Sequence, residues 1–333
     1  MIELQTRKKI KIQVPENEDE NNVQKFNIES INEANDYYKF NGYVIFKNFI
    51  AKEHCDEIIN IWNNTIKLYD GKIYRQTTGR AEKNLFNENN WIMNPILNIQ
   101  SLNPYKFWNL RNCVETNIFK NKKICTFLNK NFGLKPKIIQ SMFFEGNSAT
   151  HEHQDTYYLD SEKIGNLTAA WIAIEEIKAD AGRFFICSGS HKIDIKKLKY
   201  YKDVLFSHDL YIDELISICN QNNLVFKAPY LDQGDVLFWN SKTLHGSLNS
   251  QSKKNSRMSI TLHAIPEKDR FLHWHKHFID TPVDNLGESY IYRRKDQKLF
   301  FNRFILFLEA NFPKLFYSLK KNIIKLIYKQ NHY

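Results

Sequence analysis

Two side chains that bind metals stand two residues apart, at His153 and Asp155, shortly after an apolar stretch. On an extended segment, residues i and i+2 leave the backbone on the same face, so this imidazole and this carboxylate can converge. A third ligand must come from a distant segment, and His245 is the candidate. Two histidines and one carboxylate on one face of an octahedron leave three positions open, as in non-haem iron oxygenases. The three residues therefore predict an open Fe(II) site.

A permanently charged side chain follows at Arg257, twelve residues after His245 and on the next expected strand. A planar guanidinium binds a carboxylate through two parallel hydrogen bonds. Arg257 would thus hold the distal carboxylate of 2-oxoglutarate, whose keto-acid end would chelate iron beside O2. Alternatively, Arg257 could form an ordinary surface ion pair. His153 and Asp155 could be two residues of a surface loop, and His245 a histidine of the core.

Ordered motifs extend this pattern along most of the chain. They are the stretches 42–49 (GYVIFKNF), 140–144 (QSMFF), 153–155 (HQD), 170–174 (AWIAI), 187–191 (CSGSH), 234–238 (GDVLF) and 245–247 (HGS), followed by Arg257. In this order, over roughly residues 36 to 265, they resemble the phytanoyl-CoA hydroxylase-like (PhyH) branch of the Fe(II)/2-oxoglutarate dioxygenases. The resemblance is more specific than any single motif.

The resemblance implies an α+β fold with a double-stranded β-helix core, also called a jelly roll and similar to cupins. It implies hydroxylation of a small metabolite or biosynthetic intermediate, coupled to decarboxylation of 2-oxoglutarate to succinate. The implied iron ligands are His153, Asp155 and His245, and the implied 2-oxoglutarate residues are Arg257, Trp171, Gln140 and Ser247. Some members that carry a small residue at the carboxylate position halogenate instead, so Asp155 disfavours halogenation.

Candidate substrate contacts are less constrained by pattern. They are Tyr157, Tyr158, His151 and Arg183. The two tyrosines are equally compatible with half-buried packing, and Trp171 and Gln140 with a place in the core. We interpret His191 as structural. His273, His275 and His277 alternate, but no carboxylate partner is evident, so we expect no metal there.

The elements that must position these residues can be inferred from periodicity. Apolar spacing predicts helices over 31–40, 51–69 and 104–132. Short β-branched or aromatic runs predict strands over 42–46, 137–144, 167–177, 183–187, 224–228, 235–239 and 257–265. We expect a loose N-terminal arm over 1–28, a dioxygenase domain over 29–280 containing a partly helical insertion at 193–222, and a basic, aromatic helical tail over 281–333.

Bulk properties restrict the class of protein. The five cysteines are scattered, odd in number and without C-x-x-C spacing, so we expect neither a disulfide framework nor a zinc ribbon. The N-terminus has no apolar signal region and no run of eighteen apolar residues exists, so a cytoplasmic protein is expected. The net charge of +10 permits anionic partners, but no nucleic-acid-binding motif accompanies it, and we expect none.

The sequence does not determine what the tail contacts. Residues 314–329 place apolar side chains four apart among lysines, which suits a helix lying on an anionic membrane. A helix docked on its own domain or on a second subunit is the alternative. Besides a small-molecule substrate, the sequence leaves open a non-catalytic cupin-like binding protein and an enzyme acting on a lipid- or glycan-linked substrate. The oligomeric state is not predicted.

Overall fold

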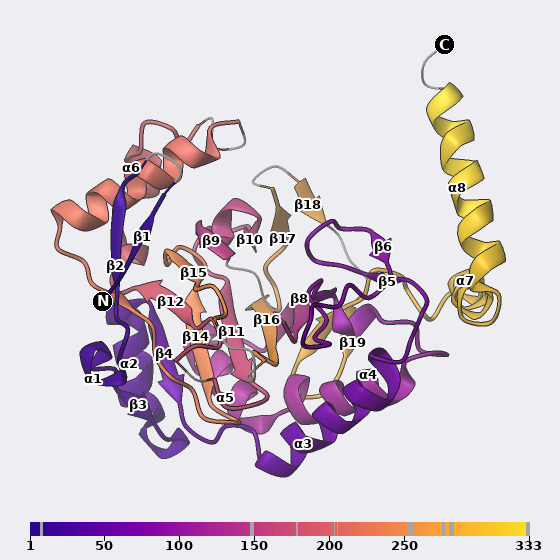
Figure 1. Cartoon of the computed structure of the whole chain (residues 1–333), viewed down its shortest axis with the longest axis horizontal. Coiled ribbons are helices and arrows are strands. Elements are labelled where there is room, and N and C mark those ends of the chain that lie inside the picture. The colour runs from indigo at the N-terminus through magenta and orange to yellow at the C-terminus, as the bar shows by residue number, and fades with distance from the viewer. Residues whose placement is uncertain are drawn as a thin grey trace.

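The computed structural model describes residues 1–6, 9–146, 150–177, 179–202, 204, 206–251, 256–274, 277–279 and 283–330, with side chains to residue 323. The chain has a mixed α/β fold built on one large and one small antiparallel-rich sheet (Figure 1). In spatial order, the large sheet contains β19 (Val283–Asn285), β20 (Tyr290–Tyr292), β8 (Pro136–Phe144), β16 (Ser259–Pro266), β11 (Thr168–Ala173), β14 (Val236–Asn240), β4 (Tyr43–Phe46) and β3 (Lys25–Phe26), with β7 (Ile96–Leu97) also paired to β8.

The small sheet carries the predicted metal ligands. Its order is β13 (Phe226–Lys227), β12 (Phe184–Cys187), β15 (His245–Ser247) and β9 (Thr150–His153). Smaller sheets are formed by β10 (Leu159–Ser161), β17 (Phe271–His273) and β18 (His277–Ile279), by β1 (Ile2–Gln5) and β2 (Lys11–Val14), and by β5 (Ile73–Tyr74) and β6 (Ala81–Glu82).

Alternation along the central strands divides the core into two layers. In β14, Val236 and Phe238 face one way, and Leu237 and Trp239 face the other. The first face joins the core beneath the helices, while the second meets Phe184 of the small sheet. Strands β11 and β14 are covered on both faces, in keeping with their largely apolar side chains. The site lies between the two sheets.

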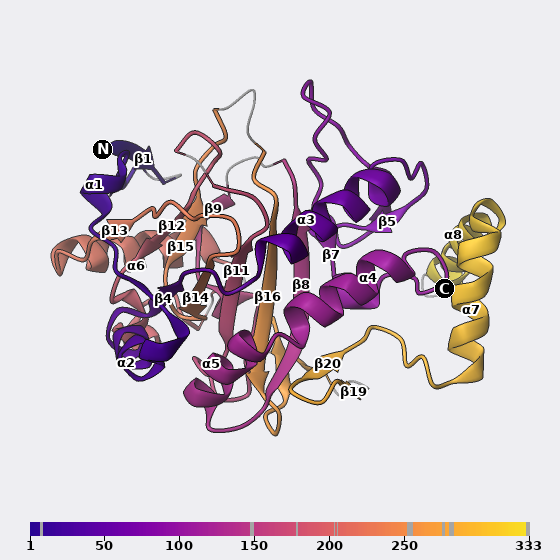
Figure 2. The ribbon, with the colours of Figure 1, turned by 90° about the horizontal axis from the view of Figure 1, so that it is seen from below.

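Four of the helices, α2 (Ile31–Asn41), α3 (Lys52–Ile61), α4 (Trp108–Val114) and α5 (Lys122–Phe132), pack on the outer face of the large sheet (Figure 2). The other α-helices are α1 (Glu18–Asn21), α6 (His208–Gln221), α7 (Phe300–Asn311) and α8 (Pro313–Gln330). The predicted helix over 51–69 continues beyond α3 as a π-helical segment, Trp62–Ile66. The predicted helix over 104–132 is broken into α4, a π-helical segment (Glu115–Phe119) and α5.

The expectation of a loose N-terminal arm is wrong. Strands β1 and β2 form a hairpin whose Ile12 and Val14 are buried against the insertion helix α6, and β3 pairs with β4. The alternating residues Ile10, Ile12 and Val14 therefore bury an apolar face, although an acidic stretch follows them. The insertion itself is helical, as predicted, over α6.

The start of the predicted helical tail is also corrected. Strand β20 pairs in parallel with β8, and β19 pairs with β20, so residues 283–292 belong to the large sheet. Helical structure begins at Phe300. Helices α7 and α8 lie together at one end of the molecule, where α8 projects from the body (Figure 1). Among the described residues, no helix combines the length and apolarity needed to cross a bilayer.

Candidate active site

Main-chain pairing brings two of the predicted metal ligands together. Strands β9 and β15 are antiparallel neighbours, and His153 is the register partner of His245. Glycine at position 246 allows the two strands to approach each other. Any other residue would place its Cβ atom 2.8 Å from the carbonyl oxygen of Thr150 on the facing strand, which is too close. The imidazole rings consequently stand 4.3 Å apart between their centroids.

Both imidazoles are oriented by main-chain carbonyls. Nδ1 of His153 lies 2.8 Å from the carbonyl oxygen of His151, and Nδ1 of His245 lies 2.8 Å from that of Thr243. A protonated Nδ1 donating to a carbonyl leaves Nε2 with a free lone pair, the form in which histidine binds metals. Burial lowers the pKa of both residues, that of His153 to about 4, so both rings are neutral at physiological pH.

Asp155 completes the cluster from the 3-10 turn that follows β9. Its Oδ1 lies 3.8 Å from Nε2 of His153 and 3.6 Å from Nε2 of His245. One ligand atom from each of the three residues falls within 4.8 Å of the others. Burial opposes ionisation of the carboxyl, but the neighbouring imidazoles of His245 and His263 lower the pKa of Asp155 well below its usual value. The structure thus assembles the predicted triad with donor atoms facing one point.

Trp239 holds the carboxylate from the large sheet and was not predicted. Its indole Nε1–H donates to Oδ2 of Asp155 at 2.7 Å, which leaves Oδ1 directed at the imidazoles. The residue lies on the face of β14 that meets the small sheet, where an apolar strand pattern indicates simple core packing. Only the fold shows that this indole has a carboxylate partner.

Trp239→Phe is expected to weaken Fe(II) binding about 10- to 100-fold, the usual cost of losing a hydrogen-bond partner of a metal ligand. Anaerobic titration of Fe(II) against a competing chelator measures this. Trp62→Phe is the matched control, because Trp62 is equally buried but its indole nitrogen has no partner in the described structure. Equal losses in both variants would mean that Trp239 acts through packing alone.

Arg257 is a buried cation without a counter-ion in the described structure. Its Nη1 donates to the carbonyl oxygen of Gly182 at 2.8 Å, while Nε has no partner. The guanidinium lies over the rings of Phe144 and Trp171, 5.5 and 5.7 Å from their centroids. Burial lowers the pKa of Arg257 to about 9, which still leaves it charged at neutral pH. A buried charge of this kind favours an anionic ligand.

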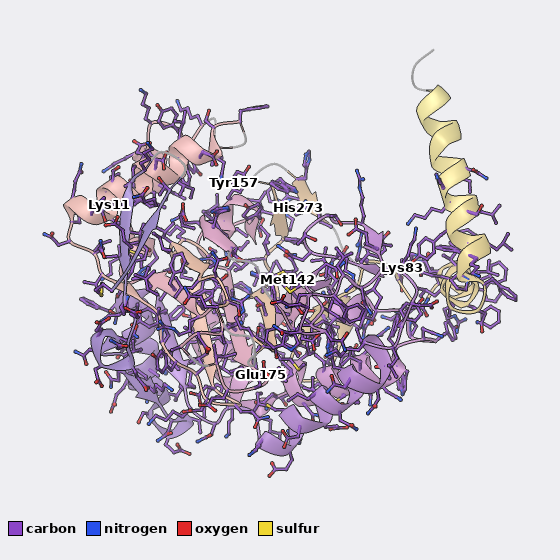
Figure 3. The ribbon with its side chains drawn as sticks, viewed as in Figure 1. Lys11, Lys83, Met142, Tyr157, Glu175 and His273 are labelled. Atoms are coloured by element: carbon purple, nitrogen blue, oxygen red, sulfur yellow. The ribbon has the colours of Figure 1, made fainter. Side chains whose placement is uncertain are left out.

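A cavity of about 900 Å³ opens beside the cluster, large enough for a drug-sized molecule. Its lining includes the ligands His153 and Asp155 and three other predicted site residues, Gln140, His151 and Tyr158. Met142 and His273, which also line it, are labelled in Figure 3 together with Tyr157. Tyr157 lies behind Tyr158, with their ring centroids 4.6 Å apart.

Two further predicted site residues, Trp171 and Ser247, are not among the residues that line the cavity. Trp171 is buried between the sheets, stacked on Phe184 and beneath Arg257. Ser247 accepts a hydrogen bond at Oγ from the main-chain N–H of Thr150, so it also ties β15 to β9.

Arg183 does not line the cavity, in contrast to the prediction of a substrate contact. Its guanidinium donates to the carbonyl oxygens of Ala179, Ala228, Pro15 and Glu16 and lies over the ring of Tyr230. All of its polar groups are thus used by the fold. Arg183 anchors the N-terminal segment, and this is its structural role.

His263 is a third histidine beside Asp155, and sequence reasoning missed it. Its Nε2 lies 3.5 Å from Oδ1 of Asp155, and the residue lines the cavity opposite Gln140 on β8. Neither ring nitrogen has a hydrogen-bond partner in the described structure. A signal was present, because Ser259, Thr261 and His263 are polar at every second position of an otherwise apolar strand.

Two aromatic residues from outside the matched motifs also shape the cavity. His208, at the start of the insertion helix α6, stacks on Tyr157 with ring centroids 3.9 Å apart, and Trp274 packs against Tyr158 at 5.2 Å. Of the alternating histidines, His273 lines the cavity and His277 is exposed, while His275 lies outside the described residues. His191 contacts the carbonyl oxygen of Lys39, in keeping with the structural interpretation.

Known proteins share both sequence and fold with this chain. Two curated relatives, the phytanoyl-CoA dioxygenase domain-containing protein 1 homologs of Caenorhabditis elegans and Caenorhabditis briggsae, are 25% and 24% identical over 143 residues. These matches cover 40% of this chain and 48% of each relative, so the chain spans about half the length of the curated relatives it matches.

Among solved structures, the non-heme alpha ketoglutarate dependent epimerase SnoN is similar with a TM-score of 0.54 and 13% identity, covering 79% of this chain and 98% of SnoN. The carbocyclase SnoK gives a TM-score of 0.51 and 16% identity, covering 72% and 85%. These likenesses show a shared fold. The family model for phytanoyl-CoA dioxygenase (PhyH) matches residues 38–259, two thirds of the chain. The chain therefore belongs to the phytanoyl-CoA dioxygenase (PhyH) family.

Proposed function

We propose that the chain is an Fe(II)/2-oxoglutarate-dependent dioxygenase that hydroxylates a C–H bond of a small metabolite or biosynthetic intermediate, with decarboxylation of 2-oxoglutarate to succinate and CO2. One observation carries the proposal. Three ligand atoms of His153, Asp155 and His245 converge within 4.8 Å. A buried arginine without a counter-ion in the described structure, Arg257, lies over Trp171, which stacks on Phe184, and Phe184 stacks on His245. Membership of the PhyH family and the fold shared with SnoK and SnoN support the assignment to Fe(II)/2-oxoglutarate-dependent enzymes.

The residues fit the two groups that this function requires. Two neutral imidazoles and one carboxylate are the donor set of an iron site with open positions, and such a site would be held by His153, Asp155 and His245. Arg257 offers its unpartnered Nε and a charge to a carboxylate, with Trp171 beneath it. When bound, Fe(II) and 2-oxoglutarate supply the oxidising chemistry with O2.

The chain's own residues bind, orient and enclose these reactants. The carbonyls of His151 and Thr243 fix the imidazoles, and Trp239 fixes the carboxylate, so the ligands need not reorganise when metal binds. Gln140, His151 and Tyr158 would contact the substrate or co-substrate, since they line the cavity beside the ligands. Tyr157 would support Tyr158 from behind, and Ser247 would keep the two ligand strands in register.

We also propose that the two facing sheets form a double-stranded β-helix. The inner faces of β11 and β14 pack on β12, where Trp171 and Trp239 meet Phe184. This arrangement supports a jelly-roll domain over residues 29–280, to which β3, β19 and β20 add edge strands.

Turnover of 2-oxoglutarate tests the proposal and separates it from a cupin-like binding protein. Purified protein supplied with Fe(II), 2-oxoglutarate and O2 should form succinate slowly without substrate and faster with it. A protein that binds 2-oxoglutarate tightly but forms no succinate with any candidate substrate would be a binding module.

A second proposal concerns the tail, which we infer to contact an anionic membrane surface. Exposed apolar side chains follow one face of α8, at Leu315, Leu319 and Ile323, and α7 also exposes Phe300 and Phe304. Residues 298–330 contain seven basic residues (Lys298, Arg303, Lys314, Lys320, Lys321, Lys325 and Lys329) and a single acidic one, Glu309. Apolar area combined with excess positive charge favours such surfaces.

Leu315→Glu combined with Leu319→Glu is expected to reduce binding to vesicles containing phosphatidylserine at least about tenfold, because each buried leucine contributes roughly 1.5–3 kcal/mol. Co-sedimentation measures this. Val225→Glu is the control, since Val225 is 53% exposed against 52% for Leu319 and lies near the insertion helix instead. Equal vesicle binding in all three proteins would contradict membrane contact by this face.

A further inference from the structure

A second, smaller cavity lies at the base of the tail, between α7, α8 and the segment that links β5 to the body. Its volume is about 200 Å³, and it is lined in part by Lys72, Lys106, Arg294 and Lys295. Lys320 of α8 adjoins it, with Nζ 3.0 Å from the hydroxyl of Tyr74, another lining residue. We call these five cations the basic cluster.

The basic cluster has no carboxylate partners in the described part of the chain. Arg293, its neighbour in sequence, shows the contrast, because Arg293 forms ion pairs with Glu115 and Asp284. Glu309 is the one carboxylate among the lining residues, and it accepts a hydrogen bond from the hydroxyl of Tyr317 at 2.7 Å. Among the described residues that line this cavity, four positive charges therefore face one negative charge, and Lys320 adjoins them.

Aromatic rings hold the cations in place. The guanidinium of Arg294 lies 4.0 Å from the ring centroid of Tyr74, and Nζ of Lys72 lies 5.4 Å from that of Tyr317. Such contacts with ring faces restrict the side chains but do not neutralise them. Burial lowers the pKa of Lys295, and Glu309 and Tyr74 oppose this effect more strongly than Lys320 and Arg294 add to it. A bound anion would further compensate the charge of this partly buried ammonium group.

The small cavity adjoins the large one. Leu97, Asn98 and Arg294 line both. A volume of about 200 Å³ is several times the share of a water molecule (about 30 Å³) but below that of drug-sized ligand sites (about 300 Å³ and more), so it suits one compact group. Arg294 thus borders both the small cavity and the cavity lined by His153 and Asp155.

We propose that the basic cluster binds a phosphoryl group of the substrate, whose remainder reaches the metal site past Arg294, which borders both cavities. The inference rests on the proposed function for the identity of the large cavity as the active site. A phosphoryl group is compact, multiply charged and rich in acceptor oxygens, which matches arginine and lysine donors. The phosphoryl group belongs either to a soluble phosphate ester or to a lipid headgroup presented beside α7 and α8.

Calorimetric titration of the full chain with inorganic phosphate at low ionic strength tests the proposal. Saturable binding is expected in the wild type, and Lys72→Glu combined with Arg294→Glu should weaken it about tenfold or more, because hydrogen bonds to charged groups are lost and charges reversed. Lys122→Glu combined with Lys196→Glu makes the same charge change at exposed sites on other elements and should leave binding unchanged. No saturable binding, or equal weakening in both double variants, overturns the proposal.

Two further arms complete the experiment. Vesicles with phosphatidic acid that compete with phosphate identify a lipid headgroup as the source, and phosphate binding without such competition identifies a soluble ester. Anaerobic 2-oxoglutarate binding with Fe(II) is measured in the same samples and should be unaffected by the cluster variant. A wild-type protein that does not bind 2-oxoglutarate would refute the dioxygenase function. A wild-type protein that binds 2-oxoglutarate but not phosphate would refute only the proposed phosphoryl site at the basic cluster.

Discussion

Asp155→Ala is expected to abolish succinate formation and to reduce Fe(II) affinity by about two orders of magnitude or more. The carboxylate is the only anionic member of the three-residue cluster, and its Oδ1 faces both imidazoles. Without it, two neutral imidazoles remain, which bind Fe(II) weakly and leave its charge uncompensated in a buried site. Anaerobic Fe(II) titration and succinate quantification measure the two losses.

Asp160→Asn provides the control for a buried carboxylate that does not face the metal site. Asp160 accepts hydrogen bonds from the main-chain N–H groups of Ser161, Gly165 and Leu167 and from the hydroxyl of Ser241. Its replacement is expected to lower Tm, since buried donors lose a charged acceptor, while Fe(II) affinity is kept. Undiminished Fe(II) affinity in Asp155→Ala would contradict the assigned ligand set.

Arg257→Met is expected to weaken 2-oxoglutarate binding at least about thirtyfold while leaving Tm unchanged or raised. Truncating one partner of a buried charge pair costs about 2–5 kcal/mol of binding free energy. In the free protein, however, the guanidinium donates to the carbonyl oxygen of Gly182 and has no counter-ion among the described residues. Removing an uncompensated buried charge relieves its desolvation cost, so stability should not fall.

Arg183→Met should show the reverse effects. Arg183 is also buried, but it donates to four main-chain carbonyls and joins the N-terminal segment to the body. The variant is expected to unfold at a lower temperature and to bind 2-oxoglutarate with the affinity of the wild type. Thermal unfolding with and without 2-oxoglutarate measures both quantities, because a ligand at 100 times its Kd adds about 2.7 kcal/mol of stability. Loss of stability in Arg257→Met with normal 2-oxoglutarate affinity would refute its role as a clamp.

The ligand set was predictable because its geometry is local or carried by motifs. His153 and Asp155 lie on either side of the extended residue Gln154, so their spacing places both on one face. Trp239 and His263 were not predictable as functional residues, since their contacts with Asp155 depend on strands far apart in the sequence. The alternation of polar residues that ends at His263 indicated that His263 lies on the polar face of its strand, but it did not indicate that Asp155 lies beside it.

The fold was predictable where strands are long and their runs apolar, as in β8 and β16. It was not predictable at the edges. Strand β20 has three residues and gains its place by parallel pairing with β8, a contact between segments about 150 residues apart that no local pattern encodes. The misjudged role of Arg183 has a similar cause, because its partners, Pro15 and Glu16, come from a distant part of the chain.

The most direct test of the central claim is anaerobic addition of Fe(II) and 2-oxoglutarate to the purified chain, followed by visible absorption spectroscopy. Chelation of Fe(II) by the keto acid at an open three-ligand site produces a weak metal-to-ligand charge-transfer band. The account predicts this band in the wild type and its loss in Asp155→Ala and Arg257→Ala. A wild-type protein with neither the band nor affinity for 2-oxoglutarate would contradict the account.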